Sequence, residues 1–147
     1  QEIDLSGFDL SGATDMSYVF NNCTALKTIK FGKINTTNVT TMRELFMQCT
    51  NLTSVNLPNN FVRSKCTDLN CMFEGCEKLT SVNTTGWNTS NVTDMTAMFE
   101  NCYNLQTFDL SMFDITKVTS VKWMFLNCRS LTTIYAKTGT NWGTKRG

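Results

Sequence analysis

Cysteine is the residue type in this chain that most readily suggests chemistry, because a thiol can form a disulfide, bind a metal or act as a nucleophile. Five of the seven cysteines recur about every 26 residues, with one interval a single residue longer. These column cysteines are Cys23, Cys49, Cys76, Cys102 and Cys128. Each lies in an apolar-Phe-x-x-Cys-x-x-Leu pattern, as in Met98 to Leu105. So constant a period predicts a stack of repeated units.

The column cysteines could form a disulfide framework or ligate a metal, since stacked coils bring equivalent residues close together. A single cysteine per coil on an inward stripe is, however, typical of a small buried hydrophobe, and we expect these thiols to be reduced and structural. The run Cys66-x4-Cys71-x4-Cys76 lacks the short spacing of structural zinc sites, and the chain has no histidine. We therefore expect no metal and no cofactor. Cys71 is expected to face outward, either as a free thiol or paired with Cys66.

The sequence gives little support for a catalytic function or for a strongly charged partner. The regularly spaced acids are explained below as helix caps, and others such as Asp4 and Asp114 lie near strand exits, so we predict that the chain is not an enzyme. A net charge of +1, from 13 basic and 12 acidic residues, argues against a nucleic-acid partner. No apolar run is long enough to insert this fragment into a membrane.

Strands are predicted shortly after each column cysteine, where apolar residues alternate with polar ones. The segments are Ile3-x-Leu5, Leu26-x-x-Ile29-x-Phe31, Leu52-x-x-Val55-x-Leu57, Leu79-x-x-Val82-x-Thr84, Leu105-x-x-Phe108-x-Leu110 and Leu131-x-x-Ile134-x-Ala136. Because every coil runs the same way round, the six strands should pair in parallel.

A short helix is predicted before each cysteine. Residues suited to an N-cap stand at one position of every repeat, namely Asp15, Thr41, Asp68, Asp94 and Ser120. Beyond the cap, the spacing of Met95, Met98 and Phe99 at i, i+3 and i+4 would put them on one buried helix face. The predicted fold class is therefore α/β, a solenoid with one parallel strand and one short helix per coil.

The chain is predicted to be a single solenoid domain over residues 1–147, with about five coils and a partial sixth. It opens within a strand pattern at Ile3, and Trp142 resembles the start of a further unit, so we interpret it as a piece excised from a longer array.

The segment from Trp87 to Met95, together with Met-Phe-x-x-Cys-x-x-Leu, resembles the bacterial surface protein repeat of about 26 residues, which is related to the BspA-like, or Treponema-type, leucine-rich repeats. The resemblance implies a right-handed, leucine-rich-repeat-like solenoid in a cell-surface or secreted bacterial protein. It further implies adhesion and interaction with a host.

The candidate ligand-binding surface is the outward side of the predicted sheet, called here the sheet face. Its residues are Thr28, Lys30, Ser54, Asn56, Ser81, Asn83, Thr107, Asp109, Thr133 and Tyr135. A rigid array of polar side chains can bind an extended partner at a low entropic cost. The function expected is a non-enzymatic adhesion module for a protein or host-surface ligand, monomeric in itself. The alternative is a structural spacer with no ligand of its own.

Overall fold

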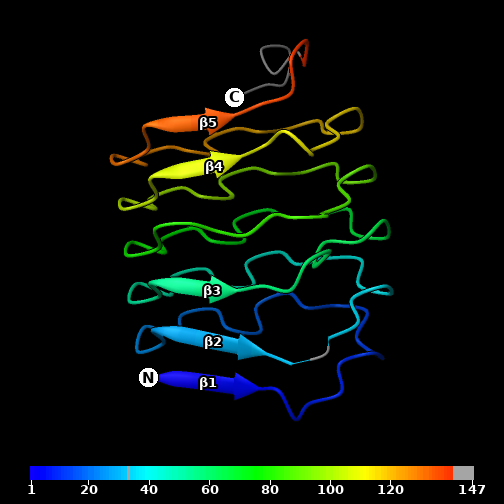
Figure 1. The fold of residues 1–147 in the computed structure, drawn as a ribbon, viewed down its shortest axis with the longest axis vertical. Coiled ribbons are helices and arrows are strands. Elements are labelled where there is room, and N and C mark those ends of the chain that lie inside the picture. Colours follow the sequence, from blue (N-terminus) through cyan, green and yellow to red (C-terminus); the bar gives the residue numbers. More distant parts are fainter. Residues whose placement is uncertain (33, 141–147) are drawn as a thin grey trace.

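The computed structural model describes residues 1–32 and 34–140. The chain winds into a stack of coils, with the N-terminus at the bottom of Figure 1 and the strands aligned above one another on one side. Trp142, expected to begin a further unit, lies outside the described residues.

Five short strands occupy equivalent places in their coils: β1 (Glu2–Leu5), β2 (Thr28–Phe31), β3 (Ser54–Asn56), β4 (Thr107–Asp109) and β5 (Thr133–Tyr135). They form two sheets, β1-β2-β3 and β4-β5. All pairs are parallel, and the registers place Ile3 beside Ile29 and Phe108 beside Ile134. Residues one repeat apart in the sequence are therefore neighbours in space.

The strand expected between Leu79 and Thr84 does not form, and this coil separates the two sheets (Figure 1). The extra residue of the longer repeat lies just after β3, near Pro58. The resulting turn packs against the strandless coil, where the Asn60 N–H donates to the Thr85 carbonyl at 2.9 Å. The Asn83 side-chain amide donates to Asn59 Oδ1 at 3.1 Å. These contacts replace the regular strand pairing.

The predicted helices are wrong: residues 1–32 and 34–140 contain no helix, so the one-helix-per-coil α/β solenoid is not the fold. The segments assigned to helices are runs of tight turns. In one of them the Leu45 N–H donates to Met42, the Met47 N–H to Glu44 and the Cys49 N–H to Phe46, each three residues back. Turns of this kind repeat the i, i+3, i+4 burial pattern of a helix.

Coil spacing explains why turns replace the helix. Phe46 and Phe73 lie in neighbouring coils with ring centroids 5.3 Å apart, so the coils stack at nearly the spacing of paired strands on this side as well. A helix with its side chains is about 10 Å across and does not fit into a layer this thin. Half of the N–H groups bond instead to the next coil: those of Met42, Glu44 and Phe46 donate to Asp68, Asn70 and Met72 at 2.9–3.0 Å.

Each run of turns contains two residues with positive φ. One set directly precedes the column cysteines: Asn22, Gln48, Gly75, Asn101 and Asn127, with φ between 59° and 70°. The other lies four residues earlier: Tyr18, Glu44, Cys71, Ala97 and Trp123. The left-handed residues reverse the chain within a single layer, which leaves the alternate N–H groups aimed at the neighbouring coil.

The core is a continuous column of side chains that no coil could bury alone. Five phenylalanine rings stack nearly parallel at centroid distances of 5.2–5.8 Å, in the order Phe20, Phe46, Phe73, Phe99 and Phe125. Strand residues such as Ile29, Val55 and Phe108 pack against this ladder from the other side and are almost fully buried. Burial of apolar surface between neighbouring coils is the main stabilising contribution.

Candidate binding surface

The sheet face lies on the outer side of the strands. Lys30, Asn56 and Asp109 are exposed and alternate with the buried Ile29, Val55 and Phe108. Of the remaining members, Ser81, Asn83, Thr107 and Tyr135 are exposed, and Thr28, Ser54 and Thr133 are half-buried. The parallel register keeps equivalent residues in line: Thr28 pairs with Ser54, Lys30 with Asn56, and Asp109 with Tyr135.

Some of these side chains are already engaged within the protein. Lys30 Nζ lies 3.4 Å from Asp4 Oδ2 in the coil below, and both side chains are largely exposed. The Asp109 carboxylate accepts the Ser111 N–H at 2.8 Å, and its hydrogen bonds to the side chain and backbone of Ser111 lower its pKa. Asn83 is bonded to Asn59 and also accepts the Thr85 N–H. These residues are held in place and keep a polar surface toward solvent.

The strandless coil interrupts the regularity of the sheet face. Ser81 and Asn83 carry no strand pairing to Ser54 or Asn56 below, whereas β4 and β5 resume it above. The surface is thus two aligned patches, one on β1–β3 and one on β4–β5, joined by an irregular segment.

The column cysteines face inward and are hydrogen-bonded. The Sγ of Cys49, Cys76 and Cys102 each donates to a phenylalanine carbonyl of the coil below at 3.1 Å. Cys128 does the same toward Phe99, while Cys23 in the first coil is half-buried. Burial raises the pKa of Cys49 to about 12 and that of Cys128 to about 11, so these thiols stay protonated at neutral pH. Protonated, buried thiols are poor nucleophiles.

No disulfide forms among the seven cysteines. Cys66 is fully buried, with its Sγ 3.7 Å from the Asp68 carbonyl, and burial raises its pKa to about 12. Cys71 is half-buried at a left-handed position, and burial together with the nearby Glu74 raises its thiol pKa further. Cys71 is thus less exposed than its outward column suggested, and the two cysteines are free rather than paired with each other.

The residues predicted as N-caps have no helix to cap. Their side chains accept the N–H two residues later, as Asp94 Oδ1 does from Thr96 at 2.7 Å and Ser120 Oγ from Lys122 at 3.3 Å. The same bond is made by Asp15, Thr41 and Asp68. Their backbones form single parallel bridges from each coil to the next. Short polar side chains that bond locally favour such turns as strongly as they favour helix starts.

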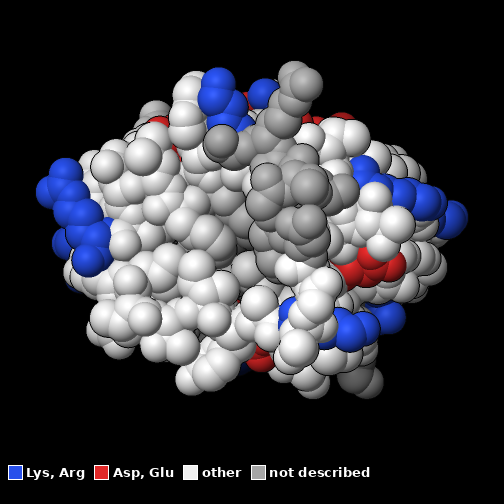
Figure 2. Space-filling view, turned by 90° about the horizontal axis from the view of Figure 1, so that it is seen from above, with Lys and Arg blue, Asp and Glu red and all other residues white. Residues whose placement is uncertain are grey.

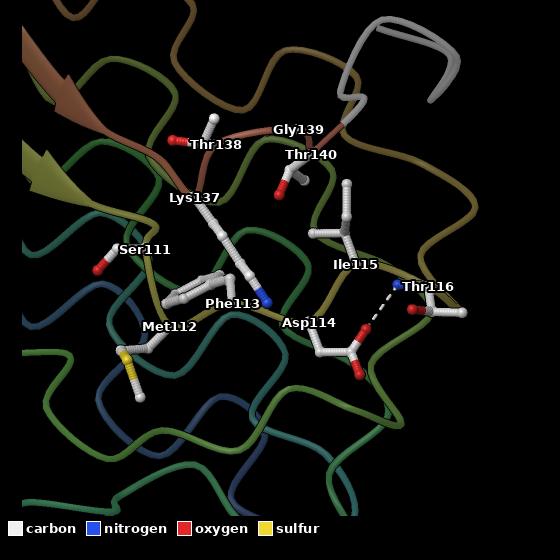
Figure 3. A pocket seen from close by; sticks show the side chains of 10 residues that line it. All are labelled: Ser111, Met112, Phe113, Asp114, Ile115, Thr116, Lys137, Thr138, Gly139 and Thr140. Atoms are coloured by element: carbon white, nitrogen blue, oxygen red, sulfur yellow. Dashed lines mark hydrogen bonds between the residues drawn. The ribbon is translucent and has the colours of Figure 1, made fainter.

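A hollow lies near the C-terminal end, between residues 111–116 and the loop 137–140 (Figure 3). Its volume is about 890 Å³, and the Lys137 side chain extends into it. Hydrogen bonds from the side chain and the backbone N–H of Thr116 lower the carboxyl pKa of Asp114 on its floor, and the nearby charges of Lys117 and Lys137 lower it further. It is a wide surface depression whose lining carries one lysine and one carboxylate, and the carboxylate is already hydrogen-bonded to Thr116. Among the described residues, no three His, Cys, Asp or Glu side chains gather where they could hold a metal.

Apolar side chains are exposed at the two ends of the stack, and the sequence did not predict them. Trp123, Leu126 and Ile134 are exposed at one end, and Phe8, Tyr18 and Val19 at the other. Of these, Val19 and Ile134 belong to columns that are buried in the inner coils, as at Leu45 and Phe108.

Fold and surface define a class of protein: a stack of coils about 26 residues long, without helices over the part of the chain that the structure describes, with a phenylalanine ladder inside and a polar sheet face outside. The chain belongs to the family described as "Mycoplasma protein of unknown function, DUF285", which matches residues 1–82 and, in a second overlapping match, 55–146. Comparison with curated proteins and with solved structures finds no match.

This family membership corrects the resemblance drawn from the repeat motif. The chain belongs to that family and not to the BspA-like leucine-rich repeats, and the absence of a helix in each coil agrees with this correction. Within the described residues, there is no helix with the length and apolar character required to cross a bilayer.

Proposed function

We propose that this chain is a non-enzymatic binding module, displayed on or secreted from a bacterial cell, that recognises a protein or host-surface ligand through its sheet face. The observation that carries the proposal is the outermost strand column. Its five members, one from each of five successive coils, are all exposed: Lys30, Asn56, Asn83, Asp109 and Tyr135.

Rigidity supports binding by this column. The strand backbones are fixed by parallel pairing and by the buried ladder beneath, so little conformational entropy is lost when a partner docks. Tyr135 offers an exposed ring with a hydroxyl, a side chain that is common in binding surfaces. Lys30 and Asp109 place opposite charges in different patches, which would orient an extended ligand.

The test compares two multiple-alanine variants of the purified chain. One replaces Lys30, Asn56, Asn83, Asp109 and Tyr135; the matched control replaces exposed hydroxyl residues away from the strands, namely Ser11, Thr37, Ser64 and Thr116. Binding is measured to fixed mammalian epithelial cells and to arrayed extracellular-matrix proteins. The sheet-face variant should lose binding that the wild type and the control both retain. Unchanged binding by a folded sheet-face variant would contradict the assignment.

A structural spacer is the second candidate, and the continuity of the ladder favours it. Each coil contacts only its neighbours through the same phenylalanine stack and N–H bonds, so coil number alone sets the length of such a stack. A spacer predicts that the wild-type chain binds none of the probes above.

A further inference from the structure

The middle coils carry polar side chains on the sheet face and at its edge that have no partner of their own. Six uncharged side chains there make no hydrogen bond within the described residues, 1–32 and 34–140. They are called here the neutral patch: Ser54, Asn56, Thr80, Ser81, Gln106 and Thr107. All are exposed except Ser54, which is half-buried. Their donors and acceptors are therefore open to a ligand.

The charges of the sheet face are compensated within the protein. Lys30 Nζ lies 3.4 Å from Asp4 Oδ2, and the Asp109 carboxylate accepts the Ser111 N–H at 2.8 Å. Seen down the stack, most of the visible surface is uncharged, and the Lys and Arg side chains lie at separate places around the outline (Figure 2). A polyanion such as a nucleic acid is held by many cations placed along its backbone. The neutral patch does not suit a ligand of that kind.

The neutral patch also differs from the centre of a protein–protein interface. Such a centre is apolar, rich in aromatic residues and poor in serine. Among the described residues from Phe20 to Ser111, however, no large apolar side chain is exposed. The surface offers hydroxyl and amide groups in place of an apolar anchor, so we expect its ligand to be uncharged and rich in hydroxyl groups.

Sugars match these groups. The amides of Asn56 and Gln106 each combine a carbonyl acceptor with two N–H donors, so each can bond two neighbouring hydroxyl groups of one sugar ring. The hydroxyls of Ser81 and Thr107 can donate or accept. Tyr135, at one end of the outermost column, is 57% exposed. The face of its ring carries partial negative charge and can pack against the C–H groups of a sugar ring.

The spacing of the coils indicates how the sugars are linked. The rings of Phe46, Phe73 and Phe99 stack at 5.3 and 5.2 Å, close to the distance between paired strands. In an extended β-1,4-linked glycan, each sugar advances by nearly the same distance. We propose that the neutral patch binds an uncharged, extended β-1,4-linked glycan that lies along the stack with one sugar per coil. The inference rests on the proposed function and names the class of its ligand.

The experiment is calorimetric titration of the purified chain with cello- and chito-oligosaccharides, from the disaccharide to the hexasaccharide. The affinity should rise with length, because each added sugar reaches another coil, and it should change little with salt. The double variant Asn56→Ala, Gln106→Ala should bind the hexasaccharide about tenfold more weakly, the loss expected for one or two hydrogen bonds. The matched control, Asn38→Ala with Asn88→Ala, removes two exposed amides away from the strands and should bind like the wild type.

Circular dichroism of each variant confirms that the fold persists; if the double variant does not fold, Thr107→Tyr, which covers part of the patch, takes its place. The proposal would be overturned if neither hexasaccharide bound, if the affinity fell steeply with salt, or if the control lost as much affinity as the double variant.

A second assay separates this inference from the proposed function. Epithelial cells are treated with periodate, which cleaves neighbouring diols of sugars, or with a protease, before the chain is added. Loss of binding after periodate supports a glycan ligand. Binding that survives periodate but not the protease would identify a protein partner and overturn the glycan, while the sheet face remains a binding surface. A chain that binds the hexasaccharide but no cells would contradict adhesion to a host and support the glycan site.

Discussion

The Sγ of Cys76 donates a hydrogen bond to the backbone carbonyl of Phe46, 3.1 Å away in the preceding coil. The same bond links Cys49 to Phe20 and Cys102 to Phe73. These column cysteines are therefore more than small apolar fillers, since each of the three thiols adds a hydrogen bond between coils to a carbonyl that also accepts a backbone N–H of its own coil.

Replacing Cys76 by alanine should lower the free energy of unfolding by about 2 kcal/mol, because it removes the thiol hydrogen bond and leaves a small cavity in a fully buried site. Urea denaturation measures the change. The control is Cys23→Ala in the half-buried first coil, where the loss should be clearly smaller. Equal losses at both positions would contradict the role assigned to the inter-coil bond.

Stability should fall at alkaline pH. Burial raises the pKa of Cys49 and Cys66 from 9.0 to about 12, so above about pH 9 the unfolded chain releases protons that the folded chain still holds. Their contribution is complete below pH 9.0 and is lost as the pH rises toward about 12. Denaturation midpoints measured from about pH 7 to about pH 11 should show the decline. A Cys49→Ala, Cys66→Ala variant should decline less; an identical slope would argue against the thiols.

Thiol labelling of the native chain should separate the cysteines into two groups. Cys71, which the sequence predicted to face outward, should react first together with Cys23 and Cys128 of the end coils, because all three are half-buried. Cys49, Cys66, Cys76 and Cys102 are fully buried and should react only on unfolding. Mass spectrometry after a short exposure to iodoacetamide identifies the labelled sites. Equal, slow reaction of all seven would contradict this order.

At the left-handed turn positions, the effect of a substitution on stability should depend on whether the new residue tolerates a positive φ. Asn22 has a φ of 59° and an exposed side chain, so Asn22→Gly should keep or slightly raise the melting temperature. Asn22→Val should destabilise by about 1–2 kcal/mol, because a β-branched residue is strained in this region. The matched control, Thr24→Val in the next turn, should have little effect, as Thr24 is absent from the residues with positive φ.

The sequence predicted the repeat, the parallel pairing and the inward columns, because all three follow from the regular spacing of apolar residues along the chain. Met95, Met98, Phe99 and Cys102 are all fully buried, as their spacing indicated. The spacing did not determine the backbone: consecutive turns bury the same positions as a helix, and only the thin coil layer decides between them. One signal was available, since asparagine or glycine precedes four of the five column cysteines and both tolerate positive φ.

The sequence predicted which residues face outward on the candidate surface, but it did not predict that the surface is interrupted. The alternation of apolar and polar residues along each strand correctly predicted that Lys30 and Asp109 face outward. The gap at Ser81 and Asn83 lies beside the single extra residue near Pro58, whose turn contacts the following coil. That contact is between coils, and no pattern within one repeat could reveal it.

The strandless coil, where the sheet is interrupted, is the place at which the stack can bend, and it is called here the joint. On the turn side the bonds cross it without interruption, as from Leu69 to Asp94 and from Phe73 to Met98, whereas on the strand side the sheet is broken. On the strand side the two halves are joined by separate hydrogen bonds, such as those from the Gln106 N–H to the Thr80 carbonyl and from Thr84 Oγ1 to the Asp109 carbonyl, instead of a continuous sheet, and we expect the rod to bend there more easily than elsewhere. An extended ligand lying along the sheet face would bridge the joint, so its binding would stiffen the whole rod.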